Sequence, residues 1–359
     1  MMRKQLVITC LLTLCALVAA GCGGGEPAPD AAAGGEGAAS PADGTVDASE
    51  NEEGSLEGVT LRLGSSSVPD YSDVTLLRLV GQLEERGAQV EVSHFEGDQA
   101  PLRALVAGEI DVAAAGVPAT IHLAQQTDEG VRVFGVNLQQ TDYILVAQPE
   151  FTELADLQGE QIGIASPGGI SDVLTRLVLE GEGIPLDSVE FVSVGGTGAR
   201  MSAMASGQLA AGPAHAADAL AAVEQSGMSN LWMYADTVDS YLQQGLVSTE
   251  GWLAENPELA QTIVDELIDA SRWAGENKDE YVELSLEAVE GPSETVRQQA
   301  YDIFTDIEMF PVNGGMTEEQ LTNTAQIEVD LGNIADLPAL EAFSDPSFVQ
   351  DYLDREGEL

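Results

Sequence analysis

The hydrophobic and polar positions change their period several times after residue 58. Residues 59–64 form a short apolar run typical of a buried strand, and residues 65–67 are a loop of three serines. Apolar residues then recur every three or four positions after the tripeptide at 72–74, the spacing of a helix that buries one face. The predicted unit is completed by a second strand at 89–95, a second helix at about 99–107 and a third strand near Ile110.

The same unit occurs a second time. Ser72-Asp73-Val74 returns as Ser171-Asp172-Val173, 99 positions later, with no gap between the copies. The same offset relates Gly97 to Gly196, Ala104 to Ala203 and Gly108 to Gly207. Each copy therefore reads strand, helix, strand, helix, strand, and right-handed crossovers make such a sheet parallel. We expect the serine of each tripeptide to be the N-cap of its helix, with the aspartate in the first turn.

Two parallel lobes predict where a ligand binds. Parallel sheets bind ligands outside the carboxyl ends of their strands, where the first turn of each helix has unpaired N–H groups. We expect those groups, at residues 65–74 and 168–173, to line a cleft between the lobes. The alternative is a purely structural role, in which the serines only cap their helices and contact no ligand.

The two aspartates of the repeat decide which ligand charge fits. Helix N-termini favour an anion such as a sulfonate or carboxylate, but Asp73 and Asp172 would repel one if they faced the cleft. We expect both aspartates to point to solvent; if they face the cleft, a cationic or neutral ligand such as an aminopyrimidine fits better. Tyr71 either stacks on a ligand ring or belongs to the ordinary packing of the core or rim. His215, just past a predicted strand end, either contacts the ligand or lies at the surface.

The remaining pattern predicts a hinge and a helical extension. Strands at 131–136 and 143–147 flank a polar segment at 139–142, and the chain returns through 241–248. Two crossing segments of this kind permit the lobes to open and close. From Thr249 the pattern is helical, and we expect the helices that begin at Asn256-Pro257 and at about 279, 293 and 317 to pack on the first lobe.

The N-terminal segment predicts export and lipid anchoring. Residues 1–22 are a signal peptide with Arg3 and Lys4 before an apolar stretch, and residues 17–22 resemble a bacterial lipobox. That resemblance makes Cys22 the lipidated first residue of an extracytoplasmic, membrane-anchored protein; ordinary secretory cleavage with a free Cys22 is the alternative. Residues 23–57 are predicted to be a flexible acidic tether, because they lack large apolar residues. The expected lobes are 58–142 with 245–359, and 143–244.

Charge and cysteine usage exclude several functions. The formal net charge is −48, and loss of Arg3 and Lys4 makes it −50, which disfavours nucleic acid as a partner. A surface this acidic is typical of adaptation to high salt, although a compositional bias of the lineage would look the same. Cys10 and Cys15 leave with the leader, so the folded part has no cysteine. We predict no metal, no cofactor and no thiolate chemistry there.

Three runs then resemble a known family. These are residues 104–113, residues 154–164 and Trp252-Leu253-Ala254-Glu255-Asn256-Pro257-Glu258. They resemble the extracytoplasmic substrate-binding proteins of ABC importers, in the branch of sulfonate, nitrate and thiamine-pyrimidine-precursor binders (NMT1/THI5-like). The resemblance covers nearly all of 59–355. It implies a periplasmic-binding-protein-like type II fold, α/β, with two pseudo-symmetric βαβαβ lobes, two crossing segments and a C-terminal helical extension on lobe 1.

The resemblance also implies a site and partners. Family contacts carried onto matching loops are Ser65, Ser66, Gly116, Gln140, Gly168, Gly169, Ser171 and Thr197; Pro167, Gly196, Tyr71 and His215 join them from the same loops. The implied partners are a small molecule (a sulfonate, nitrate or carboxylate, or a pyrimidine-like compound) and an ABC permease.

The expected function is therefore binding without catalysis. Alternatives are a pyrimidine-precursor synthase-like enzyme on the same fold, and a surface receptor that serves no transporter. Scattered histidines and the absence of a nucleophile-base pair at readable spacing count against the enzyme.

Overall fold

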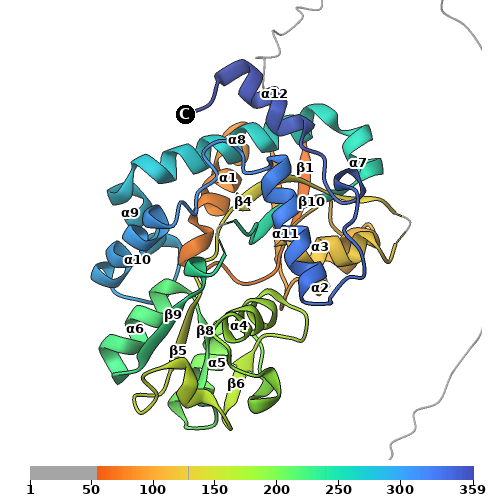
Figure 1. Ribbon diagram of the computed structural model, residues 1–359. Coiled ribbons are helices and arrows are strands. Elements are labelled where there is room, and N and C mark those ends of the chain that lie inside the picture. Colours follow the sequence, from red (N-terminus) through yellow and green to blue (C-terminus); the bar gives the residue numbers. More distant parts are fainter. Residues whose placement is uncertain (1–54, 128, 239) are drawn as a thin grey trace, which may run out of the picture. The chain divides into compact units, whose positions relative to one another are not determined.

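The computed structural model describes residues 55–127, 129–238 and 240–359. The leader, Cys22 and nearly all of the predicted tether lie outside the described residues, so cleavage and lipidation stay predictions. Within the described ranges, no helix is both long and apolar enough to span a membrane. The described chain contains two five-stranded sheets with helices packed around them (Figure 1).

The first sheet combines strands from both ends of the folded chain. Its order is β2-β1-β3-β10-β4, with β1, β2 and β3 parallel and β10 antiparallel to its two neighbours. The strands are β1 (Thr60–Ser65), β2 (Gln89–His94), β3 (Val112–Gly116), β4 (Val131–Leu138) and β10 (Gln244–Thr249). Because β10 follows the whole second sheet in sequence, the chain enters and leaves that sheet by two crossings.

The second sheet repeats the arrangement. Its order is β7-β6-β8-β5-β9, and β6 pairs in parallel with β7 and β8 while β5 is antiparallel to β8 and β9. The strands are β5 (Ile144–Ala147), β6 (Gln161–Ile164), β7 (Glu190–Ser193), β8 (Ala211–Ala214) and β9 (Ser229–Met233). The exact residues at which the lobes divide stay a prediction.

The strand register confirms the repeat. In the first sheet Leu63 lies opposite Val92 and Val112, and in the second sheet Ile162 lies opposite Phe191 and Ala211. Each residue of the second set lies 99 positions after its counterpart (63 to 162, 92 to 191, 112 to 211), so the two copies pair in the same way.

A glycine in each first strand supports the same equivalence. A Cβ at Gly64 would lie 2.5 Å from Cδ1 of Ile110, and a Cβ at Gly163 would lie 2.5 Å from Cδ1 of Leu209. Both glycines let an aliphatic side chain of the following repeat segment pass over the strand. The sequence offset therefore preserves packing as well as pairing.

Helices connect the strands and cover the sheets. In the repeats they are α1 (Val74–Glu85), α2 (Gln99–Val106), α3 (Val117–Ala124), α4 (Ile170–Gly181), α5 (Thr197–Ala205) and α6 (Ala216–Ser226). Short 3-10 turns are η1 (Tyr71–Asp73), η2 (Leu154–Leu157), η3 (Leu186–Ser188), η4 (Tyr234–Asp236) and η5 (Leu340–Ala342). The extension comprises α7 (Glu250–Glu255), α8 (Pro257–Glu276), α9 (Lys278–Ala288), α10 (Glu294–Asp306), α11 (Glu318–Asp330) and α12 (Ser347–Glu356).

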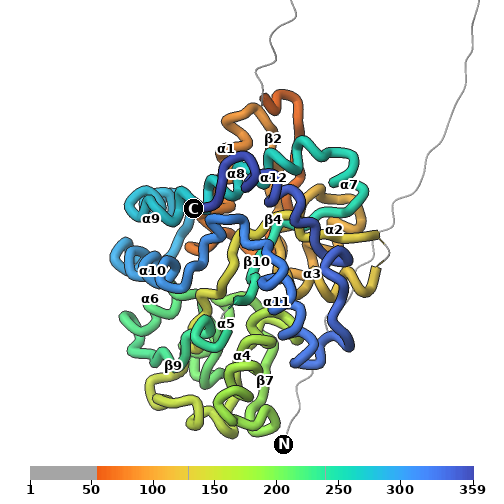
Figure 2. Tube along the Cα trace, turned by 45° about the horizontal axis from the view of Figure 1, so that its top comes forward, coloured from red at the N-terminus to blue at the C-terminus, as the bar shows by residue number. Residues whose placement is uncertain are grey.

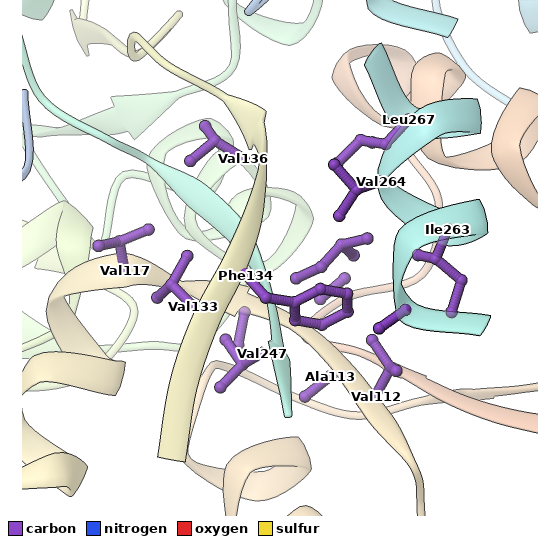
Figure 3. Close-up of a cluster of buried hydrophobic side chains, with 14 of the residues drawn as sticks. Val112, Ala113, Val117, Val133, Phe134, Val136, Val247, Ile263, Val264 and Leu267 are labelled. Carbon is purple, nitrogen blue, oxygen red and sulfur yellow. The ribbon is translucent and has the colours of Figure 1, made fainter. Parts of the chain in front are cut away.

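The core of the first lobe lies between its sheet and α8. Phe134 of β4 is fully buried near Ile263, Val264 and Leu267, which lie on one face of α8 (Figure 3). A Cβ at Gly135 would lie 3.0 Å from Cδ2 of Leu267, so the strand needs glycine where the helix approaches it.

The sequence pattern predicted that the C-terminal extension packs on the first lobe. The extension packs on both lobes instead. Helix α8 packs on α1 and β4, and α11 packs on α3 across a long sequence separation (Figures 1 and 2). Helix α10, however, packs on α6 of the second lobe. Apolar residues of α10, including Ala300 and Phe304, share one buried cluster with Ala217 of α6. The extension therefore contacts both lobes.

The prediction that the repeat serines are N-caps is wrong in both copies. Ser72 lies inside η1, and the carboxylate of Asp70 caps that turn by accepting the N–H of Ser72 at 2.7 Å. Helix α4 begins before Ser171, whose Oγ accepts the N–H of Ala165 at 2.8 Å. Each serine instead ties its helix to the preceding loop.

Candidate functional site

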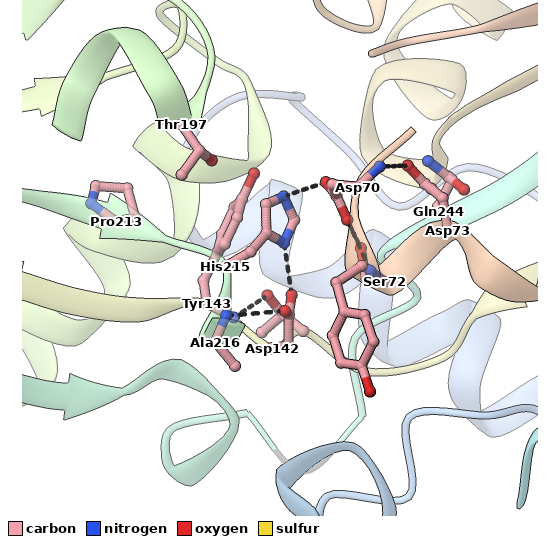
Figure 4. Close-up of polar contacts among 12 residues, drawn as sticks. Asp70, Ser72, Asp73, Asp142, Tyr143, Thr197, Pro213, His215, Ala216 and Gln244 are labelled. Atoms are coloured by element: carbon pink, nitrogen blue, oxygen red, sulfur yellow. Dashed lines mark hydrogen bonds and ion pairs between the residues drawn. The ribbon is translucent and has the colours of Figure 1, made fainter. Parts of the chain in front are cut away.

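A cluster around His215 joins three separate segments of the chain. His215 follows β8 and precedes α6; its Nδ1 lies 2.7 Å from Oδ1 of Asp142 in the first crossing, and its Nε2 lies 3.3 Å from Oδ2 of Asp70 in the first lobe (Figure 4). The ring of Tyr143 lies 4.4 Å from the imidazole, centroid to centroid. The cluster therefore connects the two lobes and the crossing.

The charges around His215 favour its protonated form. Burial lowers the pKa of His215, but the carboxylates of Asp142 and Asp70 outweigh burial and hold that pKa well above its usual value. An imidazolium donates from both ring nitrogens, so it suits a position between two acceptors. The sequence alternative of a plain surface histidine is wrong, because only 15% of this side chain is exposed.

Three further carboxyl groups are hard to ionise, and those of Asp73 and Asp218 feel the charge of His215. Burial, then the neighbouring charge of Asp70, raises the pKa of Asp73 to about 8. Burial also raises the pKa of Asp98, against hydrogen bonds from Gly116 and Ser66. Burial raises the pKa of Asp218 too, although His215 opposes the shift. Desolvation disfavours the charged form of each of these side chains.

The expectation that the repeat aspartates point to solvent is wrong. Asp73 is 3% exposed and Asp172 is 4% exposed. Oδ2 of Asp73 accepts the N–H of Asp70 at 3.1 Å, and Oδ2 of Asp172 accepts the N–H of Gly168 at 2.9 Å. Asp172 also accepts Nε of Arg176 at 2.6 Å.

Four single N–H groups at or just before helix starts donate to carboxylates. Asp70 accepts from Ser72 at η1, and Asp172 accepts from Gly168 before α4. The remaining two are Asp98, accepting from Gly116 at 2.8 Å before α3, and Asp142, accepting from Ala216 at 3.0 Å at the start of α6. One N–H at each of these places is therefore used within the protein, and no N-cap side chain caps α3, α4 or α6 in the described residues.

A buried arginine orders the loop before α5. Arg200 is 1% exposed and donates to the carbonyl of Pro213 at 2.8 Å, the carbonyl of Gly195 at 2.6 Å and Oγ1 of Thr197 at 3.0 Å. Its guanidinium lies 5.9 Å from the ring centroid of Tyr143. Arg200 thus connects Thr197, a predicted site residue, to the His215 cluster.

Several predicted site residues have structural contacts instead. Tyr71 is 3% exposed, its ring packs on Tyr281 and Phe304, and its hydroxyl donates to the carbonyl of Arg297 at 2.6 Å. The suggestion that Tyr71 stacks on a ligand is therefore wrong, because its ring belongs to the core. Gln140 is also buried, and its side chain bonds the backbone of Val238 and of Thr141. Ser171 is fully buried against its loop.

The other predicted residues lie at the last residue of a strand, in the loop that follows a strand, or at the first residue of a helix. Ser65 and Gly116 are buried, and Ser66, Gly168, Gly169 and Thr197 are partly exposed. Pro167 and Gly196 are exposed. Gly168 has a φ of +73°, a conformation that favours glycine. Their roles in binding stay predictions.

Sequence reasoning missed four residues of the cluster. They are Asp70, Asp142, Tyr143 and Arg200. One feature of the sequence could have marked Arg200. The chain has only 13 lysines and arginines, and one of these few cations stands just after Gly196, a glycine of the repeat. The aspartates had none, since 61 acidic residues hide the few that are buried.

Two surface cavities lie apart from this cluster. One of about 830 Å³ is lined by Arg132, Leu253, Met316 and Phe348, among others, and one of about 300 Å³ by residues that include Leu220 and Ile303. Neither cavity is lined by a predicted site residue. The candidate site is therefore defined by the positions of its residues at strand ends and by the contacts described above.

Comparison with solved structures defines the class of fold. The described chain resembles the ligand-binding component of an ABC-type import system from Staphylococcus aureus, solved with zinc bound (TM-score 0.69, 14% identity, covering 82% of this chain and 99% of the other). It also resembles the alkanesulfonate-binding protein SsuA from Xanthomonas axonopodis pv. citri (TM-score 0.63, 17% identity, covering 80% of this chain and 96% of the other). The desulfurization enzyme DszB is similar too (TM-score 0.60, 18% identity, covering 83% of this chain and 99% of the other). The chain therefore has the periplasmic-binding-protein fold, which hosts both binding proteins and an enzyme.

Within that fold class, the family is also defined. The NMT1/THI5-like family model matches residues 81–281, more than half of the chain, and the chain belongs to that family. This confirms the resemblance found in the sequence. No curated protein sequence matches the chain.

Proposed function

We propose that this protein is a membrane-anchored solute-binding protein, which captures a small molecule between its lobes and delivers it to an ABC importer. The observation that carries the proposal is the His215 cluster. It brings Asp70 of the first lobe against His215 of the second, beside the crossing residue Asp142. A ligand bound where two lobes meet stabilises the closed state, and a permease reads that state.

The contacts of the cluster favour binding over catalysis. Its histidine lies between two carboxylates, and no serine, threonine or lysine nucleophile is hydrogen bonded to that histidine in the described residues. Nucleophilic catalysis needs such a side chain within hydrogen-bond reach of its base. We therefore propose a transport role, with delivery to a permease as its last step.

Ligand binding is tested by a thermal-shift screen of the purified protein in high salt, with sulfonates, nitrate, carboxylates, pyrimidines and amines. A ligand that binds only the folded state raises the unfolding midpoint with the logarithm of its concentration. Scattering measured with and without the hit should show a smaller radius of gyration when ligand is bound. Chemical conversion of the hit by the protein alone would refute the proposal and favour the enzyme alternative.

The lipid anchor is tested separately. The wild-type protein should partition into detergent and incorporate a labelled fatty acid in a bacterial host, and Cys22→Ser should do neither. Ligand affinity should be the same in both, because residue 22 precedes the folded part. Equal detergent partition of the two proteins would refute anchoring through Cys22.

A further inference from the structure

We propose that the contact between Asp70 and His215 is a latch, which holds the two lobes together in the absence of ligand and opens when His215 loses its proton. The inference rests on the proposed function, because it concerns how far the lobes of a binding protein are closed before a ligand arrives.

His215 is fixed to the second lobe on one side of its ring. Ile144 of β5 pairs with Ala214 of β8, so Asp142 and His215 lie at the same end of the second sheet. Oδ1 of Asp142 lies 2.7 Å from Nδ1 of His215, and Oδ2 accepts the N–H of Ala216 at 3.0 Å. Both contacts stay within this end of the sheet and the start of α6. A movement between the lobes therefore does not have to break them.

Asp70 divides its two carboxylate oxygens between the lobes. Oδ1 accepts the N–H of Ser72 at 2.7 Å and the Ser72 hydroxyl at 2.6 Å, and the N–H of Asp70 donates to Oδ2 of Asp73 at 3.1 Å. These bonds fix the start of η1 within the first lobe. The other oxygen of Asp70, Oδ2, lies 3.3 Å from Nε2 of His215 (Figure 4). Opening of the lobes breaks this contact and leaves the cap of η1 in place.

The latch is the only ion pair of the described residues that joins the first lobe to the second. The others lie within the first lobe and the C-terminal extension, within α4, or, for Asp142–His215, at the crossing. Helix α10 also packs on α6, through apolar residues that carry no charge. A dependence of the lobe arrangement on pH is therefore expected to arise at the latch.

The charges around His215 give the direction of the pH effect. The groups that face the ring or lie beside it are the carboxyls of Asp70, Asp73, Asp142 and Asp218, the phenol of Tyr143 and the guanidinium of Arg200. Burial lowers the pKa of His215, but Asp142 and then Asp70 hold that pKa well above its usual value. Opening takes Asp70 away from the ring, so the open form holds the proton less tightly. The closed form is therefore favoured while His215 is protonated and is lost as the pH rises through the raised pKa.

The distance between the lobes reports the state of the latch. The folded part has no cysteine. Once Cys10, Cys15 and Cys22 are changed to serine, two dyes attach to the full chain only at Val68→Cys and Ala199→Cys. These positions are exposed on the first and the second lobe. Single-molecule energy transfer between the dyes then gives the ratio of open to closed protein. We expect mostly closed protein at pH 6 and a growing open population toward pH 10.

The measurement is made without ligand in 2 M KCl, where repulsion between the acidic surfaces of the lobes is screened. Only 15% of the His215 side chain and 29% of the Asp70 side chain are exposed, so salt screens the latch less than it screens the surface. Circular dichroism at each pH confirms that the protein is folded.

Asp70→Asn tests the latch itself. Asparagine keeps an oxygen for Ser72 but has no charge for His215, so the ratio of open to closed protein should rise about tenfold at pH 6 and should no longer change with pH. Glu250→Gln is the matched control. It removes the ion pair of 3.2 Å between Glu250 of α7 and Arg132 of β4, which does not cross between the lobes, and it should behave as wild type.

Asp73→Asn removes a second group that titrates in this range, because burial raises the pKa of Asp73 to about 8. This variant should still open as the pH rises. An Asp70→Asn protein with the wild-type ratio at pH 6, or with the wild-type pH profile, would overturn the latch. Loss of the profile in Asp73→Asn but not in Asp70→Asn would also overturn it, since Asp73 would then be the switch. A failed latch leaves the proposed function standing, and a failed ligand screen leaves the latch standing, because the two are measured separately.

Discussion

The buried carboxyl of Asp73 makes a quantitative prediction about stability and pH. Burial raises its pKa from an ordinary 3.8 to about 8 in the folded protein. Between those values the folded state keeps a proton that the unfolded state releases. Raising the pH therefore favours the unfolded state, and the stability present below pH 4 is lost progressively up to about pH 8. Asp73→Asn removes this titration.

The magnitude follows from the linkage between protonation and folding. One extra proton on the folded state lowers the free energy of unfolding by about 1.4 kcal/mol per pH unit. Over the interval from 3.8 to about 8 the effect is at most about 6 kcal/mol. An asparagine can retain the acceptor for the N–H of Asp70, so the variant should gain relative to wild type at every step upward in pH. The two proteins should be nearly equal near pH 4.

The assay is urea denaturation in 2 M KCl at half-unit steps from pH 4.5 to pH 8.5. High salt reduces the contribution of the acidic surface, because the Debye length falls to about 3 Å or less. Asp187→Asn, which removes one exposed carboxylate, should follow the wild-type curve. The reasoning is refuted if the wild-type and Asp73→Asn curves stay parallel over this range.

Three further predictions use the same denaturation assay. His215→Asn should lower the free energy of unfolding by about 3 kcal/mol at pH 6. The loss should shrink as the pH rises above 6.5, because the unfolded state then releases a proton that the folded state keeps on His215. A loss that does not depend on pH would contradict this. Arg200→Met should cost about 3 kcal/mol, since the carbonyls of Pro213 and Gly195 lose charged donors; a near-neutral effect would show that water replaces them. Gly64→Ala should cost about 1–3 kcal/mol, and Ile110→Val should recover part of that loss by removing the atom 2.5 Å from the new Cβ; additive effects would argue against the contact.

The fold could be predicted because its evidence is periodic and local. The strand patterns and the offset of 99 residues defined two equivalent sheets, and Leu63 and Ile162 pair as that offset requires. The packing of α10 on α6 could not be predicted in this way. An amphipathic helix shows that it buries a face, but its sequence does not say which lobe supplies the partner surface.

The helix starts show why an exact repeat can still mislead. Ser72 and Ser171 stand in the same tripeptide, yet one lies in a 3-10 turn and the other inside an α-helix. The upstream residues differ: Asp70 supplies a capping carboxylate, whereas Gly169 has no side chain to cap α4. A cap depends on which acceptor reaches the free N–H groups, and that acceptor lay outside the repeated residues.

The site was harder to predict because it is tertiary. Asp70, Asp142 and His215 are far apart in sequence, and only folding brings their side chains within contact. His215 was the exception, since its place after a strand end in a parallel sheet marked it as a candidate.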